Sequence, residues 1–168
     1  YEGKNVVQTQ SYGPEARGGA SRSELVISDK EIDYPKPIKL DLLLAMNQQS
    51  LDLYARDLKE GGLLVVDSTY CHQIPIPRAV KIPFTRIASE KLGREIAANI
   101  IALGAIGEIT GLVKEENLKK AVLARIPKGT EELNLKALEL GMKLGKKARE
   151  ELARRKEEDY IFVEATEV

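Results

Sequence analysis

The order of apolar segments between residues 40 and 66 limits the possible folds more than any other part of the sequence. Residues 40–46 are apolar except at Asp41, which indicates a strand buried on both faces, as in a parallel sheet. Residues 48–58 then show helical spacing of their apolar side chains, and residues 63–66 are a second apolar run. Strand, helix and strand at this spacing predict a βαβ unit with parallel strands.

Shorter signals extend this pattern in both directions. Residues 6–10 and 21–28 predict strands on either side of a loop, and residues 79–82 predict a last short strand. Helices are expected at 85–92, 96–109, 114–125 and from Thr130 onward. The chain is therefore predicted to be an α/β protein with three α/β/α layers, a mostly parallel central sheet and a helix-rich C-terminal half.

The domain organisation follows from this order of elements. We expect a single domain over residues 1–158 and a C-terminal tail at 159–168 that forms a short extended segment. The sequence opens with Tyr1 and runs directly into a strand-like segment. We therefore expect that an N-terminal segment is missing from this chain.

Composition excludes several classes of function. Lys and Arg number 26 and Asp and Glu number 26, so no basic excess favours binding to nucleic acid. The longest apolar stretch, 96–106, is too short to cross a membrane and contains Asn99. No targeting segment is recognisable, so a cytoplasmic protein is expected.

The cysteine count limits the chemistry of the chain. Cys71 is the single cysteine, which excludes an internal disulfide and an iron–sulfur cluster held by this chain alone. Asp67, Cys71 and His72 could suggest a metal site or a Cys–His nucleophile. Adjacent residues of an extended segment point apart, so we expect neither a catalytic residue nor a metal ligand here. Gly104 and Gly107 are interpreted as sites of close helix–sheet packing.

The loop after the first strand concentrates the polar and glycine residues that could bind an anion. Its ten residues are Ser11, Tyr12, Gly13, Pro14, Glu15, Ala16, Arg17, Gly18, Gly19 and Ala20. The amides of Gly18 and Gly19 could form an anion-binding nest, and Arg17 could pair with a phosphate. The alternative is a connection shaped by glycine and proline in which Arg17 pairs with Glu15. Neither common glycine-rich phosphate motif is present.

Two asparagines are further candidates. Asn47 follows a predicted central strand, where open α/β sheets bind ligands, but it also stands where a helix N-cap is expected. Asn99 lies within an apolar helix, where its amide is expected to be buried and hydrogen-bonded, or else to contact a ligand.

Residues 11–29 resemble the signature stretch of the gamma subunits of 2-oxoacid:ferredoxin oxidoreductases. The same family is resembled by residues 43–48, 61–68, 97–105, 110–113 and 127–134. The likeness is greatest to the 2-oxoglutarate branch, although the pyruvate and branched-chain branches share much of the pattern. Such subunits usually begin with a strand and a Gly-x-Gly-Gly-x-Gly loop, which this chain lacks.

The resemblance implies an accessory subunit without a cofactor of its own. Thiamine diphosphate, Mg²⁺ and iron–sulfur clusters would belong to alpha and beta catalytic subunits and a ferredoxin-like delta subunit, with ferredoxin as an indirect partner. Coenzyme A would be the co-substrate. Its site, or the interface with the catalytic subunits, would include Ser11, Tyr12, Gly13, Glu15, Arg17, Gly18, Gly19, Asn47 and Asn99. The alternatives are an independent α/β domain that binds a nucleotide or anion, and a purely structural scaffold.

Overall fold

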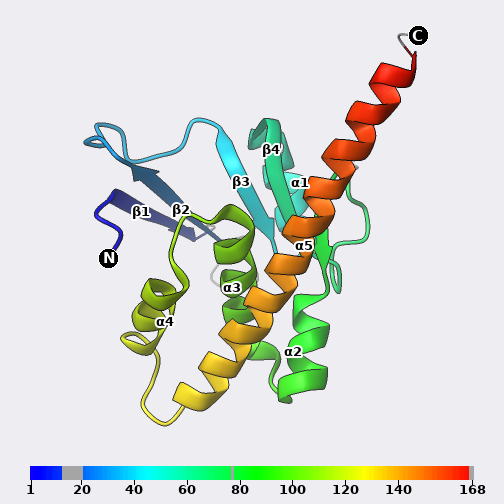
Figure 1. Ribbon diagram of the computed structural model, residues 1–168. Coiled ribbons are helices and arrows are strands. Elements are labelled where there is room, and N and C mark those ends of the chain that lie inside the picture. The colour runs from blue at the N-terminus through cyan, green and yellow to red at the C-terminus, as the bar shows by residue number, and fades with distance from the viewer. Residues whose placement is uncertain (13–20, 77, 167–168) are drawn as a thin grey trace. The chain divides into compact units, whose positions relative to one another are not determined.

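The computed structural model describes the backbone of residues 1–12, 21–76 and 78–166, and the side chains as far as Arg155 except that of Tyr12. The contacts divide the chain into two compact units, Tyr1–Pro83 and Phe84–Val168. Strands occupy the first unit and most of the helix lies in the second (Figure 1). The predicted α/β class and the helix-rich C-terminal half are therefore confirmed. The single domain over residues 1–158 stays a prediction.

The first unit contains the predicted parallel sheet. Its three strands are β3 (Leu40–Ala45), β4 (Leu58–Asp67) and β5 (Val80–Ile82), in the order β3-β4-β5. Both pairs are parallel. The short helix α1 (Gln48–Tyr54) and the 3-10 turn η1 (Ala55–Asp57) connect β3 to β4, which confirms the predicted strand–helix–strand succession.

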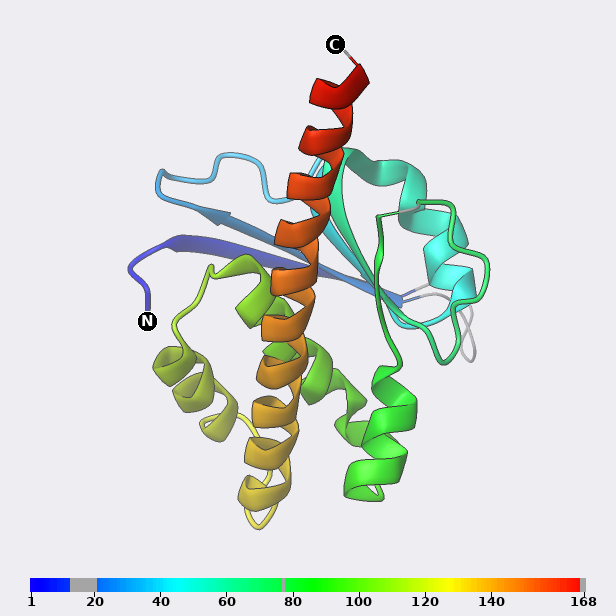
Figure 2. The same ribbon diagram turned by 45° about the vertical axis from the view of Figure 1, so that its right-hand side comes forward.

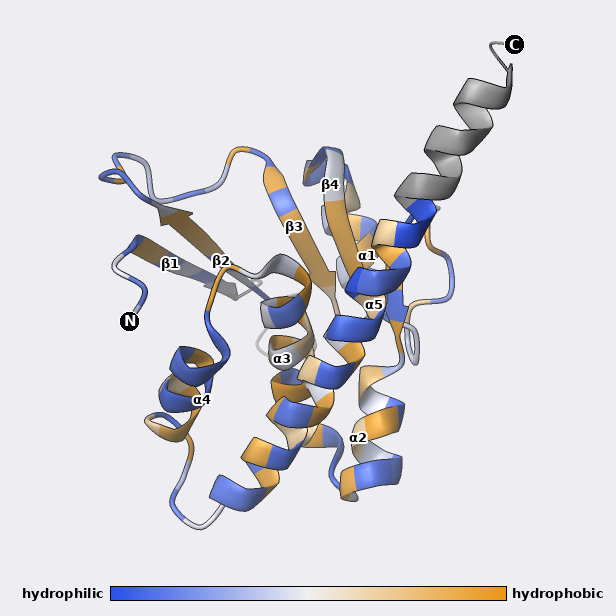
Figure 3. Ribbon diagram, viewed as in Figure 1, coloured by the Kyte–Doolittle hydropathy of each residue, from blue (hydrophilic) through white to orange (hydrophobic). Residues whose placement is uncertain are grey.

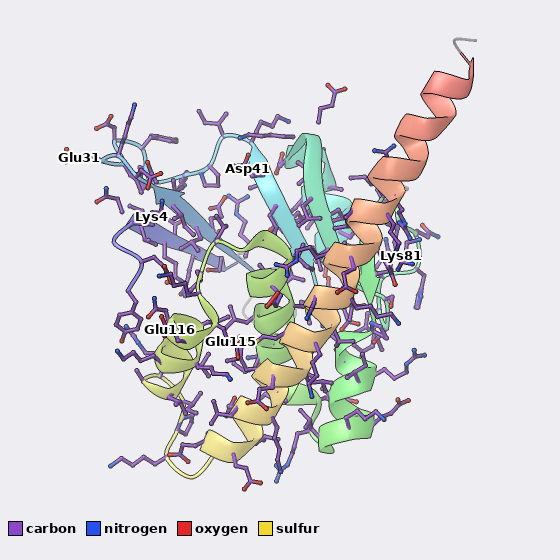
Figure 4. The ribbon with its side chains drawn as sticks, in the orientation of Figure 1. Lys4, Glu31, Asp41, Lys81, Glu115 and Glu116 are labelled. Carbon is purple, nitrogen blue, oxygen red and sulfur yellow. The ribbon has the colours of Figure 1, made fainter. Side chains whose placement is uncertain are left out.

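The sheet is stabilised by a core that α1 covers. Leu51 of α1 is fully buried against Leu43, Leu64 and Val66 of β3 and β4. Figures 2 and 3 show α1 beside these strands, and Figure 3 shows that β3 is hydrophobic along most of its length and β4 in its second half. The charged residue of β3, Asp41, lies at the exposed end and pairs with Lys59 at 2.6 Å (Figure 4). A charge within this apolar run is therefore accommodated without burial.

The strands β1 (Asn5–Tyr12) and β2 (Ser21–Ser28) form a separate antiparallel ribbon. One face of the ribbon is half-buried, and on it Glu24 accepts a hydrogen bond from the Thr9 hydroxyl at 3.2 Å. Arg22 is an ion-pair partner of Glu24 at 3.6 Å, and its guanidinium lies 5.4 Å from the centre of the Tyr54 ring. This cation–π contact joins the ribbon to the end of α1.

The second unit is helical. Its helices are α2 (Phe84–Leu92), α3 (Ala98–Thr110), α4 (Glu115–Leu123) and α5 (Glu131–Thr166), with a 3-10 turn η2 (Glu95–Ala97) before α3. Among the described residues, no helix is both long enough and apolar enough to cross a membrane. The expectation of an extended segment after residue 159 is wrong, because α5 continues to Thr166. The sequence contains no glycine or proline between Gly145 and Thr166 that would end the helix earlier.

The helices α3 and α5 pack with their backbones almost in contact. A Cβ atom added to Gly104 would lie 2.4 Å from the Leu138 carbonyl oxygen, and one added to Gly141 would lie 2.0 Å from that of Ile101. At Gly107, an added Cβ would meet the Leu118 side chain of α4 at 2.8 Å. The interpretation of Gly104 and Gly107 as helix–sheet contacts is thus wrong, since the atoms that crowd them belong to other helices.

Candidate functional site

The carboxyl edge of the parallel sheet brings together several polar residues from two segments of the first unit. There β3 ends at Ala45 and β4 ends at Asp67, and the chain leaves each strand in an irregular segment. We call the polar groups of these two segments the carboxyl-edge cluster; its members are Asn47, Gln48, Asp67, Cys71, His72 and Gln73. Open α/β sheets bind their ligands at this edge, so the cluster is the natural place for a site.

Asn47 is the N-cap of α1. Its backbone is extended, with φ −152° and ψ 164°, and its Oδ1 accepts a hydrogen bond of 2.8 Å from the Ser50 amide. The N-cap expectation is therefore confirmed, and the side chain remains exposed. The expectation that Asn47 follows a central strand is wrong, because β4 is the middle strand of the described sheet and β3 lies at its edge.

Gln48 is a member of the cluster that sequence reasoning missed. Its Oε1 accepts hydrogen bonds from the amides of His72 at 2.9 Å and Gln73 at 3.0 Å. Its Nε2 donates to the Gln73 carbonyl oxygen at 2.9 Å and to Asp52 Oδ1 at 2.8 Å. One side chain thus joins the start of α1 to the segment after β4. The sequence contains no signal for this contact, because the partners are backbone groups about 25 residues away.

Asp67 is a fully buried carboxylate at the end of the middle strand. Its Oδ1 accepts a hydrogen bond of 2.9 Å from the Thr69 amide, and its carbonyl oxygen accepts from the amides of Tyr70 and Cys71. These bonds close the turn that follows β4. Burial of the carboxylate is compatible with such bonds, because a buried ionisable group needs polar partners.

Cys71 and His72 do not form a joint site. The Cys71 thiol is 2% exposed and lies 3.6 Å from the Ala45 carbonyl oxygen, to which it donates, whereas His72 is exposed. Burial raises the pKa of the Cys71 thiol, and the nearby carboxylates of Asp67 and Asp52 raise it further. A raised pKa leaves less thiolate at neutral pH, so Cys71 is a packed thiol rather than a nucleophile.

The glycine-rich loop is described only at its first two residues. Ser11 and Tyr12 are the last residues of β1 and pair with Arg22 and Ser21 of β2. The other predicted members of this loop lie outside the described residues: Gly13, Glu15, Arg17, Gly18 and Gly19. The base of the loop is thus the end of the ribbon that Arg22 joins to α1.

Asn99 lies in the second unit, in the first turn of α3. It is exposed, and its Oδ1 accepts a hydrogen bond of 2.8 Å from the amide of Ile100. The expectation of a buried amide is therefore wrong. Burial was inferred from the apolar residues on either side of Asn99. Its own position on the helix is exposed, whereas Ala98, Ile101 and Ala102 are buried.

A small cavity of about 70 Å³ also lies in the second unit. Its polar lining includes Glu108, Glu115 (labelled in Figure 4) and Arg149. The Arg149 guanidinium forms an ion pair with the Glu108 carboxylate, with 3.4 Å between their nitrogen and oxygen atoms. This volume has room for water but not for a nucleotide-sized ligand. Over the described parts of the chain, no group of three or more His, Cys, Asp or Glu side chains could hold a metal ion.

Comparison with known proteins gives concordant matches. The family model described as "Pyruvate ferredoxin/flavodoxin oxidoreductase" matches residues 1–144. The 2-oxoglutarate synthase subunit KorC of Methanocaldococcus jannaschii is 51% identical over 150 residues, which cover 87% of this chain and 80% of that subunit.

Two solved structures share the fold. The gamma subunit of a keto/oxoacid ferredoxin oxidoreductase from Geobacter sulfurreducens is 46% identical with a TM-score of 0.75, and the match covers 86% of this chain and 82% of that one. The 2-oxoglutarate:ferredoxin oxidoreductase of Magnetococcus marinus, solved with 2-oxoglutarate, coenzyme A and succinyl-CoA bound, has a TM-score of 0.74. That match is 22% identical and covers 86% of this chain and 26% of the longer one, so it shows likeness of fold alone.

Proposed function

Because the chain belongs to the pyruvate ferredoxin/flavodoxin oxidoreductase family, we propose that it is the gamma subunit of a complex that oxidises 2-oxoglutarate. The observation that carries the proposal is 51% identity over 150 residues to a 2-oxoglutarate synthase subunit, together with the likeness to a solved gamma subunit. The overall reaction would convert 2-oxoglutarate and coenzyme A to carbon dioxide and succinyl-CoA, and two electrons would pass to ferredoxin.

The redox chemistry belongs to other subunits in this proposal. With one cysteine, which is buried, this chain offers too few thiolates for an iron–sulfur cluster. Thiamine diphosphate with Mg²⁺, and the clusters, would be held by alpha and beta catalytic subunits and a ferredoxin-like delta subunit. The gamma subunit would bind and orient, which is the part that a protein plays around such cofactors.

The contribution of this chain would be part of the coenzyme A region or of the interface with the catalytic subunits. The residues proposed for it are Ser11, Tyr12, Gly13, Glu15, Arg17, Gly18, Gly19, Asn47 and Asn99. Arg17 is the strongest of these, because a guanidinium pairs bidentately with phosphate groups, of which coenzyme A carries three. The exposure of Asn47 and Asn99 leaves their side chains accessible to a partner or ligand.

The test is an Arg17→Ala variant in the reconstituted complex, assayed by 2-oxoglutarate-dependent reduction of ferredoxin. The apparent KM for coenzyme A should rise about tenfold or more, because a lost charge-assisted hydrogen bond costs about 1.5–3 kcal/mol. The KM for 2-oxoglutarate should not change. Arg125→Ala, which removes an exposed arginine of the second unit, is the control and should alter neither value.

Other outcomes favour the alternative functions. An Arg17→Ala complex that assembles normally and keeps its KM for coenzyme A would favour a purely structural scaffold. The other alternative, an independent anion-binding domain, is tested by calorimetric titration of the isolated chain with coenzyme A. Tight binding without any other subunit would favour an independent anion-binding domain.

A further inference from the structure

In the segment after β4, the Cys71 amide donates to the Asp67 carbonyl oxygen, and one side chain, that of Gln48, binds the backbone of residues 72 and 73. Residues 71–73 are neither helix nor strand, so their amides and carbonyls need partners outside regular structure. The amides of His72 and Gln73 both donate to Gln48 Oε1, at 2.9 and 3.0 Å. The Gln73 carbonyl oxygen accepts from Gln48 Nε2 at 2.9 Å.

The contact specifies glutamine at position 48. A side-chain amide has two acceptor sites on oxygen and two donors on nitrogen. All of them are used, because Nε2 also donates to Asp52 Oδ1 at 2.8 Å. The two backbone donors also settle which end of the amide is oxygen. Glutamate would lose both donors and face Asp52 as a like charge, and asparagine would be one methylene too short.

The contact of Gln48 with residues 72 and 73 lies where it can shape a ligand site. Gln48 begins α1 three residues after the end of β3, and residues 71–73 follow the neighbouring strand β4, so the contact joins the exits of two adjacent parallel strands. His72 and Gln73 are exposed, and Tyr70 is 48% exposed. The segment and the turn before it therefore present polar and aromatic side chains at the carboxyl edge, the usual ligand edge of such sheets.

We propose that Gln48 is a positioning residue for the use of coenzyme A, holding residues 71–73 as a fixed wall of the site to which coenzyme A binds. The inference rests on the proposed function, because it assigns the carboxyl edge to the coenzyme A region. Gln48 acts through the backbone of the segment, and its own amide has no free donor or acceptor left for a ligand.

The experiment compares variants of the reconstituted complex under steady-state conditions, with coenzyme A and 2-oxoglutarate varied in turn. Gln48→Leu removes all of the hydrogen bonds and should raise the KM for coenzyme A about tenfold or more, with kcat and the KM for 2-oxoglutarate within about twofold of wild type. Gln48→Glu keeps the two acceptor contacts and should show a smaller rise. Gln49→Leu, at the next and exposed position, is the matched control and should leave the KM for coenzyme A unchanged.

A merely structural role predicts a different pattern. It would lower the melting temperature of the Gln48 variants and leave both KM values at the wild-type level, which would overturn the inference. An equal rise in both KM values would overturn it too. If the Gln48→Leu complex does not assemble, the KM values of the Gln48→Glu complex for coenzyme A and 2-oxoglutarate test the inference by the same criteria.

Arg17→Ala, measured in the same series, separates this inference from the proposed function. If Arg17→Ala raises the KM for coenzyme A and neither Gln48 variant does, the positioning role fails while the proposed function stands. If the wild-type complex turns over without dependence on coenzyme A, the proposed function fails and the inference fails with it.

Discussion

Two regions of the molecule are stabilised in opposite ways: the carboxyl edge of the first unit by hydrogen bonds from side chains, and the α3–α5 crossing of the second unit by the absence of side chains. At the carboxyl edge, Asn47 accepts a hydrogen bond from a first-turn amide of α1, and Gln48 binds the irregular backbone of residues 72 and 73. At the crossing, Gly104 and Gly141 have no side chains, and this absence lets two helices approach closely. The first arrangement therefore requires particular polar side chains, whereas the second requires that no side chain be present.

The largest effect is expected from breaking the crossing. Gly141→Ala places a Cβ 2.0 Å from the Ile101 carbonyl oxygen, so one helix must shift. Overpacking of this kind lowers the free energy of unfolding by about 1–3 kcal/mol. The loss for Gly141→Ala should lie at the upper end, because the crowding atoms are backbone atoms of Ile101 and not the end of a flexible side chain. Urea unfolding of the purified chain measures the loss.

Gly107→Ala is the matched control for that substitution. Its Cβ meets only the end of the Leu118 side chain, at 2.8 Å, which can rotate away. Because alanine favours a helix over glycine by roughly 1 kcal/mol, the variant should be as stable as wild type or slightly more stable. If Gly107→Ala destabilised the chain as much as Gly141→Ala, the contrast between side chain and backbone neighbours would be wrong.

A smaller loss is expected at the carboxyl edge. Asn47→Ala removes the N-cap of α1 and should lower the free energy of unfolding by about 1 kcal/mol. Asn47→Asp keeps an acceptor for the Ser50 amide and should retain most of the stability. The midpoints of urea unfolding compare the three proteins. Equal losses in the two variants would contradict the capping role.

The smallest effect is expected at an exposed ion pair of α5. Lys136 lies 2.6 Å from the Glu132 carboxylate, and its hydrogen bond and charge lower the pKa of that carboxyl. Since the folded-state pKa is lowered, the pair stabilises the folded chain above the ordinary pKa of about 4.3 for glutamate. This contribution is lost as the pH falls through the lowered value.

The measurement is the melting temperature as a function of pH. Lys136→Met should melt slightly below wild type at pH 7, and the two curves should converge in acid. Added salt should reduce the difference, because exposed pairs are screened. A difference that persists undiminished in acid would show that Lys136 acts by packing and not by its charge.

Regular elements and the family could be predicted because their signals are local. The apolar run that became β3 and the helical spacing that became α1 lie within a few residues of each other, and so does the cap at Asn47. The resemblance of residues 11–29 likewise depends on consecutive residues, and family membership is confirmed by the match over residues 1–144. The glycine-rich loop stays a prediction, since most of it lies outside the described residues.

The errors arose where a residue's surroundings come from distant segments. Asn99 was expected to be buried because its sequence neighbours are apolar, but the face on which it lies is exposed. Gly104 was assigned to a sheet contact, whereas its neighbours are on α5, more than 30 residues later. Gln48 stood only at the end of the family-like stretch 43–48, and its contacts were not predicted, because three of its four hydrogen bonds are to backbone groups of residues 72 and 73.

The sequence alone determined the alternation of strands and helices, the lack of enough thiolates for a cluster, and the membership of a family, since each depends on residue order or residue count. Tertiary structure decided that Gln48, and not the Cys71–His72 pair, organises the carboxyl edge. The physical reason is that hydrogen bonds and burial depend on distance in space, and the fold brings Gln48 to within 3.0 Å of a backbone amide 25 residues away.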